Sequence, residues 1–161
     1  MKISLNNTIH KKEVDLVIVN QVENSKKITA KFENSKGEKL ILEFELIEED
    51  ISDINDFNFF ISQNKKIIFY RFIYQWGVIN FNKRKLIRKV LDYSIDFPIF
   101  SEYPDCFLIE DNSFVETLNN EGKKIDRIPN EEPYNLQEYE DFFELELIGL
   151  EKRKIRRKLD S

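Results

Sequence analysis

Cysteine, histidine, glycine and proline are scarce in this chain of 161 residues, which has one Cys, one His, four Gly and four Pro. A single cysteine excludes a disulfide framework and any zinc site built from several cysteines. One histidine excludes the usual metal sites that combine imidazole ligands. Four glycines leave little material for a glycine-rich phosphate loop. The sequence therefore predicts a protein that holds no metal ion and no cofactor.

Long apolar runs are also missing. The densest apolar stretch, residues 67–74, is interrupted by Arg71, and it is far shorter than the roughly 20 residues that a membrane-spanning helix needs. Residues 1–7 turn polar before an apolar segment of signal-peptide length can form. We therefore expect a cytoplasmic protein that does not contact a membrane, and the lone Cys106 agrees with a reducing compartment.

The chain does contain enough apolar material for a packed core. Hydrophobic residues make up 41% and aromatic residues 13%, with fourteen phenylalanines. This aromatic content excludes an acidic disordered chain. A chain of this length is typical of one domain, which buries about 70% of the surface that the unfolded chain exposes. We therefore predict a single domain over residues 1–161.

Apolar and polar residues alternate with a period of two over most of the chain, which is typical of β-strands with one buried face. The clearest case is residues 27–33 and 38–48, which the turn at 34–37 joins into a predicted hairpin. In total, about ten short strands are spaced about 8–12 residues apart. We predict an all-β fold, mainly an antiparallel meander, built as a β-sandwich or an open barrel, with a partial propeller-like arrangement as the alternative.

Three segments depart from this alternation. Residues 50–57 place apolar residues three apart behind capping side chains, so we expect at most one or two short helical turns there. Residues 93–105 and 129–137 contain prolines, and we expect both to be irregular connections.

The residue types that most often carry catalysis have unfavourable surroundings. His10 lies between Ile9 and two lysines, which favours an exposed residue over a catalytic base. Cys106 lies in an apolar strand pattern beside Asp105, a carboxylate that raises a thiol pKa, so we expect a buried small side chain rather than a nucleophile. The sequence favours a protein that is not an enzyme.

Two carboxylate pairs, Glu43/Glu45 and Glu144/Glu146, are spaced two residues apart, so each pair lies on one face of its strand. Such a pair can bind a hard cation or serve as the acid and base of a glycosidase. Apolar residues occupy the alternate positions, which favours the solvated face of an amphipathic strand. A carboxylate-based enzyme, with or without a metal ion, is the first alternative for the function.

The net charge of -5 conceals a separation of signs along the chain. Acidic residues gather in 43–56 and 131–146, and basic residues gather in 83–89 and 152–158. The basic tail, 152–158, has no aromatic residue on which a base could stack. We expect this tail to protect an edge strand or to pair with the acidic stretch before it. A nucleic-acid accessory protein that uses both basic segments is the second alternative.

The acidic stretch 131–142 combines carboxylates, two tyrosines and Pro133. Tyrosine gives a large contact area, and clustered carboxylates steer a basic protein partner. We predict that such a partner binds a surface that includes Glu131, Glu132, Tyr134, Glu138, Tyr139, Glu140 and Asp141. A second acidic set is expected to contribute: Glu43, Glu45, Glu48, Glu49 and Asp50.

Residues 110–128, with the sequence EDNSFVETLNNEGKKIDRI, form a strand–turn–strand pattern. This run resembles the meander of several small all-β immunity proteins that are encoded beside bacterial polymorphic or contact-dependent toxins. The resemblance implies an inhibitor that binds a cognate toxin, often a basic nuclease, and occludes its active site with an acidic face. It places an immunity protein first among the possible functions.

Overall fold

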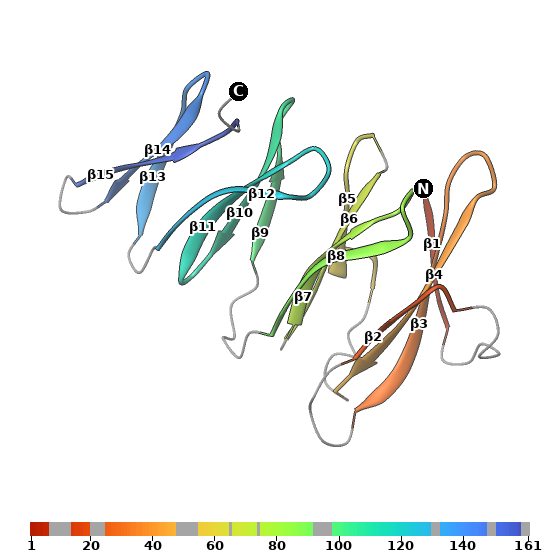
Figure 1. The fold of residues 1–161 in the computed structure, drawn as a ribbon. Helices are drawn as coiled ribbons and strands as arrows, with labels where there is room; N and C mark the ends of the chain where they lie inside the picture. The colour runs from red at the N-terminus through yellow and green to blue at the C-terminus, as the bar shows by residue number, and fades with distance from the viewer. Residues whose placement is uncertain are drawn as a thin grey trace. The chain divides into compact units, whose positions relative to one another are not determined.

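The structure is a computed structural model that describes residues 1–6, 14–19, 25–47, 55–64, 66–73, 75–91, 98–129, 133–147 and 151–158. These ranges contain fifteen strands and one 3₁₀ helix. The chain divides into two compact units, Met1–Tyr93 and Ser94–Ser161, and each unit is built from two sheets (Figure 1). The expectation of a single domain stays a prediction.

The N-terminal unit, Met1–Tyr93, begins with a four-stranded sheet in the order β1–β3–β4–β2. Its strands are β1 (Lys2–Asn6), β2 (Leu16–Ile18), β3 (Lys26–Glu33) and β4 (Lys39–Leu46). β2 runs parallel to β4, and the other pairs are antiparallel. The predicted hairpin is confirmed as β3–β4, and its turn contains Gly37 at a φ of 80°, a backbone conformation that glycine adopts without a steric penalty.

The second sheet of this unit is an antiparallel meander in chain order. Its strands are β5 (Phe59–Ile61), β6 (Ile67–Phe72), β7 (Gln75–Asn80) and β8 (Lys85–Leu91). The 3₁₀ helix η1 (Asp56–Asn58) precedes β5 and forms the described part of the predicted helical segment. Phe44 of β4 packs against Tyr70 and Phe72 of β6, with ring centroids 5.0 and 5.2 Å away. The two sheets therefore enclose a common core.

The C-terminal unit, Ser94–Ser161, also contains two antiparallel sheets. One has the order β12–β11–β10–β9, with β9 (Ile99–Glu102), β10 (Cys106–Asp111), β11 (Phe114–Asn119) and β12 (Lys124–Pro129). The other has the order β13–β14–β15, with β13 (Tyr134–Glu138), β14 (Phe142–Leu147) and β15 (Lys152–Arg156). Both sheets contribute to one buried core, which includes Leu108, Val115, Phe143 and Ile155.

The prediction of a mainly antiparallel, all-β fold is confirmed, and no sheet among the described residues closes into a barrel. The expectation of irregular segments at 93–105 and 129–137 is wrong where β9 and β13 form. The prolines do not interrupt these two strands: Pro98 and Pro104 flank β9, and Pro133 directly precedes β13. In the described part of the chain, no helix is long and apolar enough to cross a membrane.

Candidate functional site

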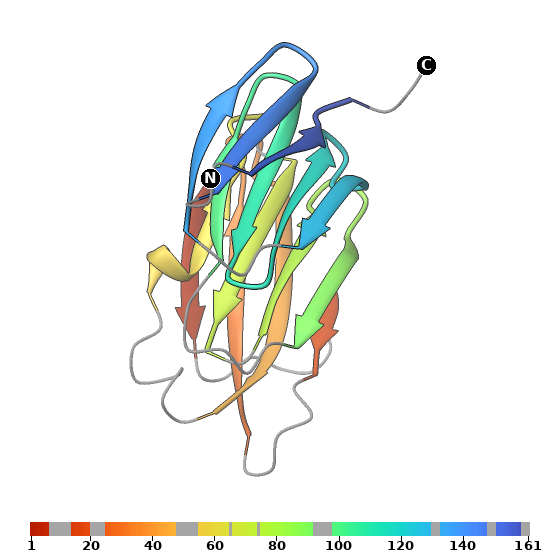
Figure 2. The same cartoon turned by 90° about the vertical axis from the view of Figure 1, so that its left-hand side faces the viewer.

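The hairpin β13–β14 presents one apolar face and one polar face. Leu136 of β13 and its neighbours Phe143 and Leu145 of β14 lie on the face that packs into the core of the C-terminal unit. Since side chains alternate along a strand, Gln137 and Glu144 lie on the opposite face. Figure 2 shows this hairpin in blue, with its tip at the top of the view. The hairpin can therefore display its outer face and its tip without exposing the core.

A stacked aromatic pair lies at the tip of the hairpin. The rings of Tyr139 and Phe142 have centroids 4.7 Å apart and an interplanar angle of 18°. Tyr139 is 41% exposed, and its hydroxyl donates a hydrogen bond to Gln137 Oε1 at 3.0 Å. The stacking holds an exposed tyrosine in one position, so a partner can bind it at low cost in side-chain entropy.

β13 is an edge strand of its sheet. The Tyr139 N–H donates to the Phe142 carbonyl at 3.0 Å, so this residue faces β14. Because successive residues direct their backbone groups to opposite sides of a strand, the N–H and C=O groups of Leu136 and Glu138 point away from β14. Within the described residues, no strand pairs with this side of β13, which leaves it as a template for an added strand.

The opposite edge of the same sheet, β15, is protected. At Arg156, the backbone N–H donates to Asp126 Oδ2 at 3.0 Å, and the carbonyl accepts from Thr117 Oγ1 at 2.6 Å. Four of the five residues of β15 are basic, a composition that discourages mispairing at edges. β13, with the sequence YNLQE, has no Lys, Arg or Pro and pairs with β14 without a bulge. Among the described residues, β15 is covered and the outer side of β13 is open.

Arg157 joins the end of β13 to the neighbouring sheet of the C-terminal unit. Its guanidinium lies 2.6 Å from Asp105, 2.7 Å from Glu138 and 2.7 Å from the Tyr139 carbonyl. It also lies 4.8 Å from the Phe143 ring centroid, within cation–π distance. Burial alone would lower the pKa of Arg157, but the hydrogen bonds with Asp105 and Glu138 outweigh it and raise the pKa. Arg157 thus positions the tip of the hairpin and neutralises much of the charge of Glu138.

The predicted partner-binding residues of this region differ in their surroundings. Tyr134 is internal, because its hydroxyl donates to Glu110 Oε2 at 2.5 Å; burial and this bond raise its pKa well above its ordinary value. Asp141 is exposed and pairs with Lys158 at 3.0 Å. Glu140 is exposed at the tip and forms no ion pair within the described part of the chain. Glu131 and Glu132 lie outside the described residues.

The second acidic set belongs to the N-terminal unit. Glu43 and Glu45 lie on the outer face of β4, where Lys27 Nζ is 2.5 Å from Glu43 and 3.6 Å from Glu45. The hydrogen bond from Lys27 to Glu43 raises the pKa of this lysine, and its ammonium offsets one of the two negative charges of the pair. Glu48, Glu49 and Asp50 lie outside the described residues. The structure does not place the two acidic sets on one sheet.

The second spaced carboxylate pair, in β14, has a similar partner. Lys152 Nζ lies 2.8 Å from Glu144 Oε1, and this hydrogen bond raises the pKa of Lys152. In both units, a lysine on the neighbouring strand thus occupies the place where a cation would bind such a pair. Among the described residues, no group of three or more His, Cys, Asp and Glu side chains could hold a metal ion.

The expectation that the basic tail pairs with the acidic stretch before it is confirmed for three cations, Lys152, Arg157 and Lys158, whose partners are Glu144, Glu138 and Asp141. Five of its six cations form an ion pair with a carboxylate: Lys152, Arg153, Arg156, Arg157 and Lys158. The sixth, Lys154, lies 4.2 Å from the centroid of the Phe142 ring. The charge of the tail therefore stabilises the C-terminal unit.

Cys106 is fully buried, as predicted. Burial and the charge of Asp105 raise the pKa of its thiol to about 11. His10 lies outside the described residues. Sequence reasoning missed the role of Arg157. The alternation of β15 places Arg153 and Ile155 on the inner face, and Arg157 continues it directly after the strand, where a buried arginine needs a carboxylate partner.

Comparison of the chain with known protein families and with curated proteins gives no match. The function is therefore inferred from the chemistry of the surface. That chemistry is concentrated on the open edge of β13 and on the tip that follows it.

Proposed function

We propose that this protein acts by binding another protein at the β13–β14 hairpin, and that an extended segment of the partner pairs with the open edge of β13. The observation that carries this proposal concerns the backbone of Leu136 and Glu138. Their N–H and C=O groups point away from β14 and have no partner strand among the described residues. Strand addition is a recurring mode of recognition, in which main-chain hydrogen bonds provide affinity and alternate side chains provide specificity. Tyr139 lies at the end of this edge and supplies an anchor.

The charge at the tip favours a basic partner. Four carboxylates, those of Asp105, Glu138, Glu140 and Asp141, lie near three cations, Arg157, Lys158 and the Lys154 that contacts the Phe142 ring. The excess of negative charge steers a basic segment towards the hairpin, and this contribution weakens as salt screens it.

We further propose that the partner is a toxin and that this protein is its immunity protein. The proposal rests on the resemblance of residues 110–128, which include β11 and most of β12. In this mechanism the hairpin occupies a basic face of the toxin and keeps the substrate from its active site. A first test is the gene neighbourhood. A toxin-like reading frame directly upstream would support this function, and the absence of one would count against it.

The edge is tested with Leu136→Pro. Proline removes an N–H that no described strand uses, and edge strands tolerate it at such positions. Leu136→Ala is the matched control, because it removes more of the side chain but keeps the N–H. We expect Leu136→Pro to abolish binding to the product of the upstream reading frame, measured by calorimetry, while Leu136→Ala still binds. Equal affinities for Leu136→Pro and the wild type would rule out strand addition at β13.

A further inference from the structure

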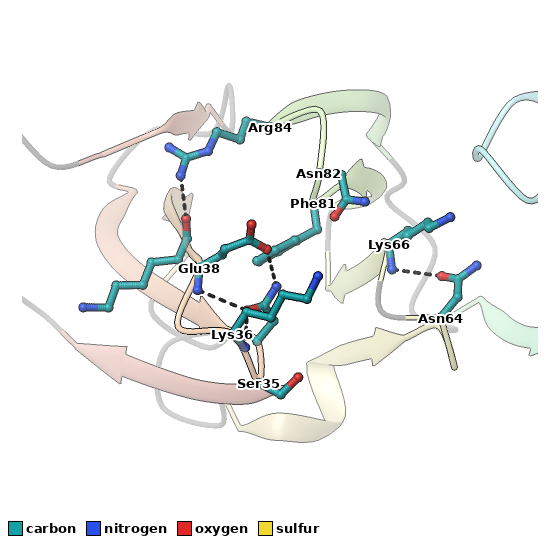
Figure 3. Close-up of a pocket in the computed structure, with 10 residues that line it drawn as sticks. Ser35, Lys36, Glu38, Asn64, Lys66, Phe81, Asn82 and Arg84 are labelled. Carbon is teal, nitrogen blue, oxygen red and sulfur yellow. Dashed lines mark hydrogen bonds between the residues drawn. The ribbon is translucent and has the colours of Figure 1, made fainter.

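The N-terminal unit contains a polar depression of about 460 Å³ where three of its hairpin turns meet. Figure 3 shows that Lys36 and Glu38 come from the β3–β4 turn, Asn64 and Lys66 from the β5–β6 turn, and Arg84 from the β7–β8 turn. The volume is within the range of small-molecule sites, which is about 300–1,000 Å³. This depression is independent of the β13–β14 hairpin, which belongs to the other unit.

The lining of the depression is strongly basic. It contains four cations, Lys36, Lys39, Lys66 and Arg84, and a single carboxylate, Glu38. This concentration of positive charge occurs in a chain whose net charge is -5. Such a local excess attracts anions in spite of the overall sign.

Two of these charged groups already have partners. Arg84 pairs with Asp15 at 2.5 Å and donates to the Lys39 carbonyl at 3.0 Å. Glu38 accepts a hydrogen bond from Asn34 Nδ2 at 2.6 Å. The ammonium groups of Lys36, Lys39 and Lys66 form no ion pair within the ranges that the structure describes. Three cations are therefore available to a ligand.

The turns that carry these lysines are held by side-chain hydrogen bonds. Asn34 Oδ1 accepts from the Lys36 N–H at 2.9 Å and from the Glu38 N–H at 3.1 Å. Asn64 Oδ1 accepts from the Lys66 N–H at 2.9 Å and from Ser62 Oγ at 2.8 Å. The backbone positions of Lys36 and Lys66 are thus set before a ligand binds, which lowers the entropic cost of binding.

We propose that this depression binds a small phosphorylated ligand, whose phosphate oxygens contact the ammonium groups of Lys36, Lys39 and Lys66. Lysine binds phosphate as a point charge and accepts many approach directions. The exposed amide of Asn82, which lines the same depression, offers a hydrogen-bond donor to the remainder of the ligand.

The proposal is tested by titrating the ¹⁵N-labelled protein with sodium pyrophosphate at physiological salt. We expect chemical-shift changes that saturate and that concentrate on the amides of Lys36, Lys66 and Asn82. The variant Lys36→Ala/Lys66→Ala should bind at least tenfold more weakly. The control variant Lys123→Ala/Lys124→Ala, which removes the same charge from the exposed start of β12 in the other unit, should bind as the wild type does.

Three results would overturn the proposal. One is the absence of saturable shifts in the depression. Another is an equal loss of affinity in the control variant, which would show that only net charge matters. The third comes from titration with a short single-stranded thymidine oligonucleotide: tighter binding than pyrophosphate, with shifts that spread along β8, would identify nucleic acid as the ligand.

Discussion

Replacing Arg157 with alanine should destabilise the C-terminal unit strongly. The side chain is 7% exposed and contacts two carboxylates, at 2.6 and 2.7 Å. Removing one partner of a buried ion pair costs about 3–5 kcal/mol, because the other charge is left uncompensated. The carboxylates keep part of their hydration, since Asp105 is 28% and Glu138 51% exposed. We therefore expect a loss near the lower end of that range, about 3 kcal/mol.

The adjacent residue provides the control. Lys158 pairs with Asp141, but their side chains are 48% and 75% exposed, and exposed ion pairs contribute about 0–1 kcal/mol. Urea unfolding followed by circular dichroism measures both variants. With a slope of about 2 kcal/mol per molar urea, Arg157→Ala should lower the midpoint by about 1.5 M, and Lys158→Ala should leave it almost unchanged.

Arg157→Lys separates charge from geometry. Lysine keeps the positive charge but lacks the planar fork that contacts two carboxylates at once, so its midpoint should lie between those of the wild type and Arg157→Ala. If Arg157→Ala and Lys158→Ala unfold at the same urea concentration, Arg157 does not join the two sheets as we describe.

Three further predictions concern the core and the open edge. The native Cys106 thiol, with a pKa of about 11 against an ordinary 9.0, should resist alkylation at pH 8 until the protein unfolds. Because the unfolded state loses this proton first, the contribution of Cys106 to stability should fall as the pH rises from 9 to 11. In hydrogen exchange, the outward amide of Leu136 should exchange much faster than that of Gln137, which faces β14; equal protection would contradict an open edge. Gly77→Ala should cost about 2 kcal/mol or more through overpacking, measured by urea unfolding, because the added Cβ would lie 2.5 Å from the Tyr70 hydroxyl.

The alternation of apolar and polar residues was sufficient to predict the fold class and most of the strands. It was insufficient at β9 and β13, because prolines near a strand were interpreted as breaks although they stand at its ends. Lys27 lies directly opposite Glu45 and reaches Glu43 diagonally. This contact depends on the register between β3 and β4, which the residue pattern alone does not determine.

The candidate site was predicted in part. The sequence identified Tyr139 and Glu140, which are exposed at the tip. It also placed Tyr134 on the surface, where the structure shows a side chain that bonds to Glu110. Tyr134 and Leu136 share a face by alternation, so a strand assignment for this segment would have predicted the inner position. The roles of Arg157 and of the open edge required the order of the strands.

Binding to a basic protein at the hairpin is tested most directly by measuring the affinity of three proteins for the product of the reading frame directly upstream. These are the wild type, the variant Tyr139→Ala/Glu140→Lys at the tip, and the control Glu33→Lys at a partly exposed position of the other unit. We predict that the tip variant binds at least 100-fold more weakly, that the control binds as the wild type does, and that the wild-type affinity falls with added salt. Equal affinity for all three proteins, or no binding by the wild type, would contradict the proposed function.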